Sequence, residues 1–322
     1  MNRTIRSILI LLATTISISG LLINYAFAEK SIGLVLWDDD KNYTDAKNSF
    51  LEQLGKDGFG EPNIKFSFEA AGGNKAKAAQ IAAKFAAAKP DMIVSFGTSA
   101  TVAIAREIKD IPVVFALVYD PVDSKIADDW KSSGNNTTGT SSKVPMSLLV
   151  EKLKQVAPVK NLAVLYTPGE RNSEAQLKDL QVAAGGLGIK VVPVPITNRE
   201  EVQMIMSVVV GKVEAVYLSG SSLVSETLPV IVDIATKAKV VTVTHQGDKA
   251  DKGVLLAISA NNYDLGRLAA EKVVKILKGA KPSSIPIEMA KKFDVILNMK
   301  TAKAGGIGVP QAFVKAATRV IE

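Results

Sequence analysis

Short apolar runs alternate with longer amphipathic segments over most of the chain, in two similar passes. In the first pass, apolar runs at 31–37, 91–99 and 111–118 accompany amphipathic segments at 45–54 and 74–88. In the second pass, the apolar runs are 161–166, 190–196, 214–222 and 239–244, and the amphipathic segments are 173–184 and 199–210. Strands that alternate with helices of about 10 to 15 residues predict parallel, doubly wound sheets. The sequence therefore predicts an α/β fold with two similar lobes and a cleft between them.

The N-terminus has the pattern of an export signal. Arg3 and Arg6 precede an apolar stretch at 8–23, and residues 26–28 (Ala-Phe-Ala) form a small-x-small cleavage site. This pattern predicts a signal peptide over residues 1–28 that is removed on secretion. The alternative is a retained membrane anchor, because the apolar stretch approaches the length that spans a bilayer.

The amino-acid composition indicates in which compartment the protein is found and which classes of partner it binds. The chain contains no cysteine, which excludes disulfides, thiolate metal sites and a lipidated N-terminal cysteine. An exported protein without a lipid anchor fits a Gram-negative periplasm. The formal net charge is +7, but the lysines are scattered along the predicted helices, as is typical of a solvated surface. Aromatic residues make up 6% of the chain and no basic stripe is present, so we do not expect nucleic acid binding.

The sequence contains no recognisable catalytic motif. His245 is the only histidine, so a His-rich metal site is excluded and a serine triad would have to use this one base. The segment 219–222 (Ser-Gly-Ser-Ser) does not form a nucleophile elbow, because Leu223 stands where the second glycine belongs. No phosphate-binding loop of the Gly-x-x-x-x-Gly-Lys-Ser/Thr type occurs. We therefore expect no enzyme activity, no metal and no cofactor.

Three of the predicted strand ends carry hydroxyl or aromatic side chains. In open parallel sheets, ligands bind outside the carboxyl ends of the strands. Trp37 offers a stacking face there, or forms an aromatic rim. Thr98 and Ser99 lead into a predicted helix, where hydroxyls and free N–H groups suit a carboxylate or phosphate, or simply cap the helix. In the second half, Ser219, Ser221 and Ser222 repeat this arrangement.

Two further strand ends add candidate ligand contacts. Tyr119 and Asp120 follow the strand 111–118, and Asp120 either receives an ammonium or hydroxyl group or belongs to a plain Asp-Pro turn. His245 and Gln246 end the matching strand of the second half. His245 serves there either as a ligand contact or as a structural hydrogen-bonding group.

Several segments resemble those of one known family. They are 96–100 (Phe-Gly-Thr-Ser-Ala), 111–115 (Ile-Pro-Val-Val-Phe), 120–122 (Asp-Pro-Val), 134–139 (Gly-Asn-Asn-Thr-Thr-Gly), 164–168 (Val-Leu-Tyr-Thr-Pro), 263–267 (Tyr-Asp-Leu-Gly-Arg) and 295–302 (Val-Ile-Leu-Asn-Met-Lys-Thr-Ala). Together, and in this order, they are similar to the ABC-transporter substrate-binding family that includes tryptophan- and tyrosine-binding members. The resemblance implies a type I periplasmic binding protein, with two doubly wound parallel-sheet lobes joined by a three-crossing hinge.

The resemblance also implies how the chain is divided. The crossings are expected near 141–144, 247–257 and 285–292. The first lobe would then comprise residues 29–143 plus about 257–285. The second would comprise residues 144–256 plus about 286–322. A monomer is the expected state for this fold.

One departure from the family bears on the ligand. Amino-acid-binding relatives tend to have a Thr-Asp-Asn-Thr stretch where this chain has Gly-Ser-Ser-Leu at 220–223. A second family acid, in a Ser-Asp-Glu-Gly pattern, is matched by Thr-His-Gln-Gly at 244–247. Because a buried ammonium needs a paired acceptor, the loss of both carboxylates favours a neutral or anionic small molecule over an α-amino acid.

These observations lead to one main hypothesis and two alternatives. The main hypothesis is a periplasmic binding protein that closes around a small organic solute and delivers it to an ABC permease. The first alternative keeps the fold but has the closed form dock on a membrane sensor kinase or cyclase. The second is a periplasmic enzyme that uses His245 as its base.

Overall fold

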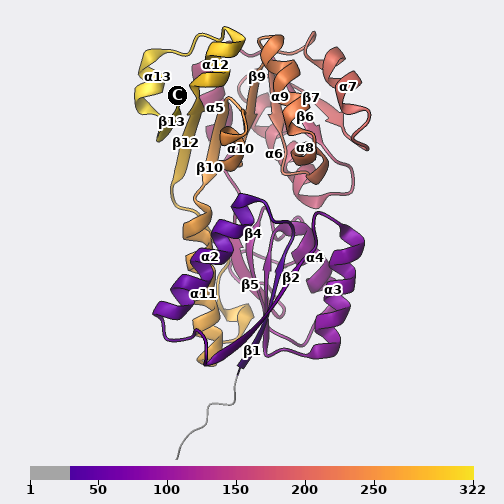
Figure 1. Cartoon of the computed structure of the whole chain (residues 1–322), viewed down its shortest axis with the longest axis vertical. Coiled ribbons are helices and arrows are strands. Elements are labelled where there is room, and N and C mark those ends of the chain that lie inside the picture. Colours follow the sequence, from indigo (N-terminus) through magenta and orange to yellow (C-terminus); the bar gives the residue numbers. More distant parts are fainter. Residues whose placement is uncertain (1–29) are drawn as a thin grey trace, which may run out of the picture.

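The computed structural model describes residues 30–322, which form two lobes stacked along the long axis of the molecule (Figure 1). The signal peptide predicted over residues 1–28 lies outside the described residues. In the described part of the chain, no helix combines the length and the apolar character needed to cross a membrane.

The first lobe is built on a six-stranded parallel sheet. Its strands, in hydrogen-bonded order, are β11 (Glu288–Met289), β5 (Thr137–Ser141), β4 (Val113–Val118), β3 (Met92–Phe96), β1 (Lys30–Leu36) and β2 (Ile64–Ala70). Its helices are α2 (Lys41–Lys56), α3 (Lys75–Ala88), α4 (Thr98–Glu107) and α11 (Asn262–Leu277), with a short 3₁₀ turn η1 (Pro282–Ser284).

The second lobe is built on a seven-stranded sheet. Its strands, in order, are β13 (Arg319–Ile321), β12 (Phe293–Asn298), β10 (Leu256–Ala260), β9 (Val241–Thr244), β8 (Ala215–Leu218), β6 (Asn161–Tyr166) and β7 (Lys190–Pro195). Its helices are α5 (Met146–Val156), α6 (Arg171–Gly185), α7 (Val202–Val209), α8 (Ser222–Glu226), α9 (Leu228–Lys237), α10 (Asp248–Asp251), α12 (Met299–Gly305) and α13 (Gln311–Ala316). β12 runs antiparallel to β10, because the chain re-enters this lobe from the cleft end of the sheet.

Both sheets are covered by helices on both faces, as the two passes of the sequence predict. Within β1, Ile32 and Leu34 pack with the residues of α2 and α11, whereas Val35 packs with those of α3 and α4. This alternation follows from the two-residue period of a strand. The α/β fold with two doubly wound lobes is thereby confirmed.

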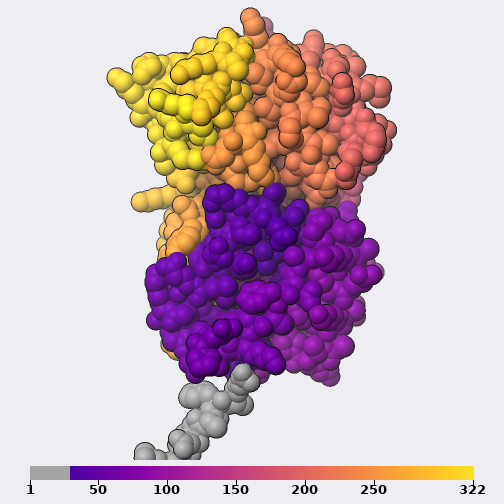
Figure 2. All heavy atoms as spheres, viewed as in Figure 1, coloured from indigo at the N-terminus to yellow at the C-terminus, as the bar shows by residue number. Residues whose placement is uncertain are grey.

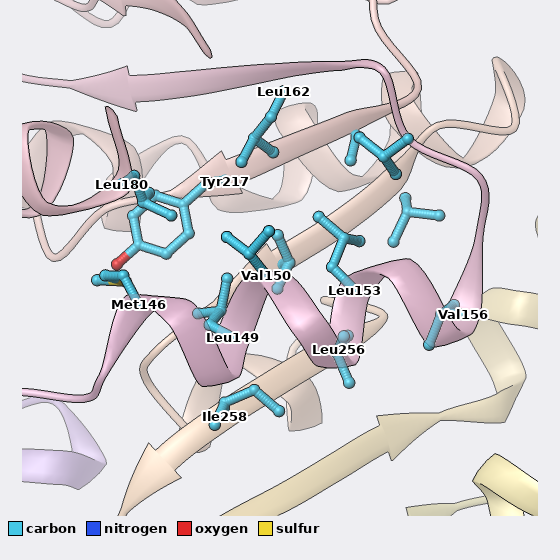
Figure 3. Packing of buried hydrophobic residues seen from close by; sticks show 14 of the residues in the cluster. Met146, Leu149, Val150, Leu153, Val156, Leu162, Leu180, Tyr217, Leu256 and Ile258 are labelled. Atoms are coloured by element: carbon cyan, nitrogen blue, oxygen red, sulfur yellow. The ribbon is translucent and has the colours of Figure 1, made fainter. Parts of the chain in front are cut away.

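The core of the second lobe shows how an amphipathic helix fixes the packing (Figure 3). In α5, Met146, Leu149, Val150 and Leu153 are spaced by three and four residues, so they share one helix face. All four are at most 4% exposed, and they belong to the same cluster as Tyr217 on β8. Truncating Leu153 to alanine would therefore cost roughly 2–5 kcal/mol.

The chain crosses between the lobes three times, and the second crossing comes later than the sequence indicated. The first lies between β5 and α5, within the expected range. β10 pairs with β9 and β12 in the second sheet, so residues 257–260 belong to the second lobe and the crossing comes just before α11. β11 pairs with β5 in the first sheet, so residues 288 and 289 belong to the first lobe and the third crossing lies at 290–292, within the expected range.

Close helix packing holds α11 in the first lobe, far in sequence from its neighbours. A Cβ atom on Gly266 would lie 2.1 Å from the backbone oxygen of Ala46 in α2. Only glycine permits this approach, so Gly266 lets α11 and α2 pack backbone to backbone. The yellow-orange helix against the indigo one in Figure 1 is this pair.

Candidate functional site

The lobes meet around a small cavity at the carboxyl ends of the strands, with a volume of about 30 Å³ and partial access to solvent. In the space-filling view, atoms from the start of the first lobe touch atoms of the second lobe directly (Figure 2). Four aromatic rings line the cavity: Trp37, Tyr43, Tyr119 and His245. Five amide side chains also line it: Asn42, Asn172, Gln176, Gln246 and Asn262. The remaining lining residues are Thr98, Ser99, Leu117, Ser142, Gly220 and Ala260.

The cavity brings together six of the ten side chains proposed from the sequence. These six are Trp37, Thr98, Ser99, Tyr119, His245 and Gln246. The other four, Asp120, Ser219, Ser221 and Ser222, do not line it. Whether any of the ten contacts a ligand stays a prediction.

Gly97 shapes the first-lobe wall of the cavity. It has a positive φ of 98°, and a Cβ atom there would lie 2.8 Å from the ring of Tyr43 and 2.9 Å from Cβ of Trp37. Glycine is therefore required both by the backbone conformation and by the lack of space. This turn places Trp37 and Tyr43 beside the start of α4.

The N-terminus of α4 lacks the side-chain cap that was one of the two roles expected for Thr98 and Ser99. No side chain caps α4, and the Oγ1 atom of Thr98 instead accepts a hydrogen bond from the backbone N–H of Tyr119, at 3.0 Å. This bond ties the end of β4 to the end of β3. The first-turn N–H groups of α4 have no partner within the helix itself, so they can donate to an oxygen atom in the cavity.

Leu117 is an unusual residue in the first-lobe wall. Its φ is 59°, and the pairing of β4 with β5 shifts register between Phe115 and Val118. A left-handed conformation is rare for a branched side chain, and such outliers cluster at functional sites. The bulge interrupts the regular alternation of β4 immediately before Tyr119.

His245 sits in a hydrogen-bonded network of neutral groups. The backbone N–H of Gly220 donates to Oε1 of Gln176 at 2.9 Å, so the amide nitrogen of Gln176 faces Nε2 of His245, at 3.3 Å. Nε2 is therefore the acceptor and Nδ1 carries the proton. Nδ1 lies 2.8 Å from the hydroxyl of Tyr217, which in turn donates to Oε1 of Gln176, at 3.4 Å.

This network keeps His245 uncharged. Burial, helped by the positive charge of Lys249, lowers the pKa of His245 from 6.5 to about 3. A second proton on Nε2 would face the amide hydrogens of Gln176. Both ring nitrogens are already engaged, so neither is free to accept a proton from a substrate, as a catalytic base would have to.

The cavity residues on helices that the sequence analysis missed include Asn42, Asn172 and Gln176. Asn42 comes from α2 in the first lobe, and the other two come from α6 in the second. Among the described residues, neither Oδ1 of Asn42 nor Oδ1 of Asn172 has a hydrogen-bond partner. The amide nitrogen of Asn172 donates to the backbone oxygen of Gly220 at 2.6 Å, which leaves its oxygen as the available atom. Each lobe thus contributes to the lining one asparagine whose buried amide oxygen has no partner among the described residues, and we call these two oxygens open acceptors.

Asp120 lies at the border of the cavity, in an ion network that joins the lobes. It accepts hydrogen bonds from the backbone N–H groups of Val122 and Asp123, and Lys143 pairs with it at 2.7 Å. Lys143 also pairs with Asp179 of the second lobe, at 2.8 Å. Burial alone would lower the pKa of Lys143, but the bonds to both acids outweigh burial and raise it.

Two of the three serines of the second lobe, Ser221 and Ser222, have structural side-chain partners. Ser221 caps α8 through Val224 N and lies 2.5 Å from the hydroxyl of Thr167. Ser219 is buried, and its hydroxyl has no hydrogen-bond partner among the described residues. Ser222 accepts a hydrogen bond from Nε1 of Trp37 at 3.0 Å, which joins the two lobes.

A second ion network joins the lobes on another side of the cavity. Lys249 is 3% exposed and pairs with Asp40 of the first lobe at 2.6 Å and with Asp248 at 3.3 Å. Lys252, which is half exposed, also reaches Asp40, at 3.1 Å. Burial opposes ionisation of Asp40, but the bonds from both lysines outweigh it and lower its pKa. In the described part of the chain, no cluster of three or more acids or histidines is placed to hold a metal ion.

Comparisons with known proteins agree with this geometry. The family model of the ABC transporter substrate binding protein matches residues 39–321. A tyrosine-binding protein of Clostridioides difficile is 27% identical over 278 residues, which are 86% of this chain and 81% of that protein.

Two solved structures are similar over 91% of this chain. One, from Streptococcus pneumoniae in complex with L-Trp, has 26% identity and a TM-score of 0.87, with all of that chain covered. The other is a ligand-free, open substrate-binding protein with adhesive properties from Clostridium difficile, with 31% identity, a TM-score of 0.72 and 99% of that chain covered. The present structure is more similar to the ligand-containing one, in keeping with its contacting lobes.

Proposed function

The chain belongs to the ABC transporter substrate binding protein family, and we propose that it captures a small organic solute between its lobes in the periplasm and delivers it to an ABC permease. The observation that supports capture is the pair of open acceptors, Asn42 and Asn172, on opposite walls of one cavity. A solute that contacts both walls stabilises the arrangement in which the lobes touch. No bond is broken in this process.

The proposed contacts combine both walls. Trp37 and Tyr119 offer ring faces, and Ser99 with the first turn of α4 offers donors to a ligand oxygen. Gln246 and the Gln176–His245 network form the opposing wall and select by shape and hydrogen bonding. These assignments extend the six cavity residues that the sequence indicated.

The proposal includes export and a monomeric state. The signal-like N-terminus supports passage across the inner membrane, with cleavage after Ala28. Fractionation of cells that express the full chain, followed by mass measurement of the purified protein, tests both points. We expect a periplasmic monomer that begins at Glu29, and a protein retained in the membrane at full mass would contradict export.

Capture is tested by thermal unfolding of the chain from Glu29, refolded from denaturant to remove any bound solute. A panel of amino acids, aromatic acids, nucleosides and sugars is added in turn. A ligand present at 100 times its dissociation constant stabilises the protein by about 2.7 kcal/mol. We expect a clear shift with one chemical class; a folded protein that responds to none would contradict capture of such solutes.

Delivery is tested in cells once the solute is known. Deletion of the gene should abolish uptake of the labelled solute, and the intact chain supplied in trans should restore it. An Asn172→Leu variant, which removes the acceptor of the second wall, should restore uptake poorly. Unchanged uptake after deletion would separate capture from transport and favour a sensory output.

A further inference from the structure

The cavity walls constrain the charge of the solute. Building on the proposed function, we propose that the solute is an uncharged polar molecule that offers N–H or O–H donors to both lobes and a ring face to the aromatic side chains. A neutral sugar and a nucleoside share this chemistry.

The residues that line the cavity carry no formal charge. Among residues 30–322, fifteen line the cavity, and none of these is Asp, Glu, Lys or Arg. The titratable residues in the lining are neutral as well. The pKa of His245 is lowered to about 3, and burial raises the pKa values of Tyr43 and Tyr119.

The charged side chains at the border of the cavity are already paired with one another. Lys143 lies between Asp120 and Asp179, and Lys249 lies between Asp40 and Asp248. A charge that leaves its partner in a partly buried site is costly. These groups therefore serve the lobe interface and are not available to neutralise a charged ligand.

The two open acceptors, Oδ1 of Asn42 and Oδ1 of Asn172, determine which ligand groups suit the cavity. Asn42 belongs to the lining and is 7% exposed, and its buried Oδ1 atom has no hydrogen-bond partner in the described chain. Such an oxygen requires a donor from the ligand, as does Oδ1 of Asn172. An ammonium would supply the donor but would bring a full positive charge to a wall without a carboxylate. An uncharged N–H or O–H group satisfies the same atoms without that cost.

The cations outside the cavity lining bear on the choice between a neutral ligand and an anion. The first turn of α4 offers N–H donors that suit a carboxylate, but they suit an uncharged hydroxyl or carbonyl oxygen equally. Three cations, Lys75, Arg106 and Arg171, line a separate cavity that shares only Ser99 with the central one. Preference for an anion would therefore implicate that second cavity.

The test uses matched ligands that differ in charge, measured by calorimetry on the refolded chain from Glu29. The sets are uridine with uridine monophosphate, glucose with gluconate, and 4-hydroxyphenylacetamide with 4-hydroxyphenylacetate and tyrosine. We expect the uncharged member of the binding set to bind at least about tenfold more tightly than its charged partners. A tighter anion or zwitterion overturns this inference and leaves capture intact. If a folded protein binds no member of any set, the proposed function fails, and the inference fails with it.

Substitutions in α2 test whether the cavity lining causes the preference for an uncharged ligand. Asn42→Asp places a carboxylate in the lining with little change of shape, whereas Asn48→Asp adds the same charge at an exposed position of α2. We expect Asn42→Asp to weaken binding of the uncharged ligand about tenfold and to improve the relative binding of an amine-bearing analogue. Asn48→Asp should leave both affinities unchanged. Equal ligand preference in the wild type and in a folded Asn42→Asp variant overturns the role of this wall.

Discussion

The wall of the inter-lobe cavity and the border around it are built from opposite kinds of residues. The wall consists of amides, hydroxyls and aromatic rings. The border carries the ion networks of Lys143 and Lys249, each of which joins acids of both lobes. The paired charges at the border hold the lobes together. Because the cavity wall itself carries no charge, it does not require a charged ligand. The two regions should therefore respond to different substitutions.

The largest effect is expected at the buried cation of the border. Lys249→Met removes the partner of Asp40 and Asp248, of which Asp248 is almost fully buried. We expect a loss of about 3 kcal/mol in the free energy of unfolding, because an uncompensated buried charge remains. Urea unfolding of the refolded protein measures it. Lys252→Met is the matched control, since Lys252 meets the same acids while half exposed and should cost about 1 kcal/mol or less. Equal losses in both variants would contradict the special role of Lys249.

The next effect is expected in the wall and depends on pH. Unfolded His245 takes up its proton near pH 6.5, whereas the folded form does so only near pH 3. Between these values the unfolded state binds more protons, so stability is fully present above pH 6.5 and is lost as the pH falls toward 3. From pH 7 to pH 5 the loss amounts to about 2 kcal/mol. Unfolding curves of the wild type and of His245→Gln, compared at both pH values, isolate this contribution. An identical pH dependence in the two proteins would show that His245 is not buried as a neutral group.

The smallest effect is expected at the hydrogen bond that joins the wall to the border. Trp37→Phe and Ser222→Ala each remove the bond from Trp37 Nε1 to Ser222 Oγ. Since one such bond contributes about 1 kcal/mol, Ser222→Ala should weaken solute binding about fivefold, and Trp37→Phe, which also changes the ring face offered to the solute, should weaken it at least as much. The double variant should be little worse than Trp37→Phe alone, because both substitutions remove the same contact. Trp130→Phe, which lies within the first lobe, serves as the control. Additive losses in the double variant would contradict a direct link.

The sequence indicated the fold and the strand ends of the site, for a clear physical reason. In doubly wound sheets the carboxyl ends of the strands face one edge, so Trp37, Thr98 and His245 could be placed at the cleft from the strand pattern alone. The boundary near residue 257 was wrong because β10 remains in the second sheet, where it pairs with β9 and β12. Local sequence does not show with which sheet an apolar run pairs.

The rest of the site depends on tertiary contacts. Asn42 and Asn172 lie in the first turns of their helices, and which helix face meets the cavity follows from packing between distant segments. An amide on an amphipathic helix is ordinarily read as a solvent-facing residue, so the sequence offered no signal for either one. Asp120 was a reasonable candidate, but its partner Lys143 lies 23 residues away, within the first crossing between the lobes.

The central claim is that a solute holds the two lobes together, and the distance between the lobes tests it most directly. The chain has no cysteine, so two can be introduced and labelled without interference, at Gln80 on α3 and at the exposed Met204 on α7. We predict that the stripped protein shows a broad distance distribution by single-molecule energy transfer, and that a saturating uncharged solute converts it to one short distance. An unchanged distribution at saturation would show that binding does not close the lobes and would contradict the account.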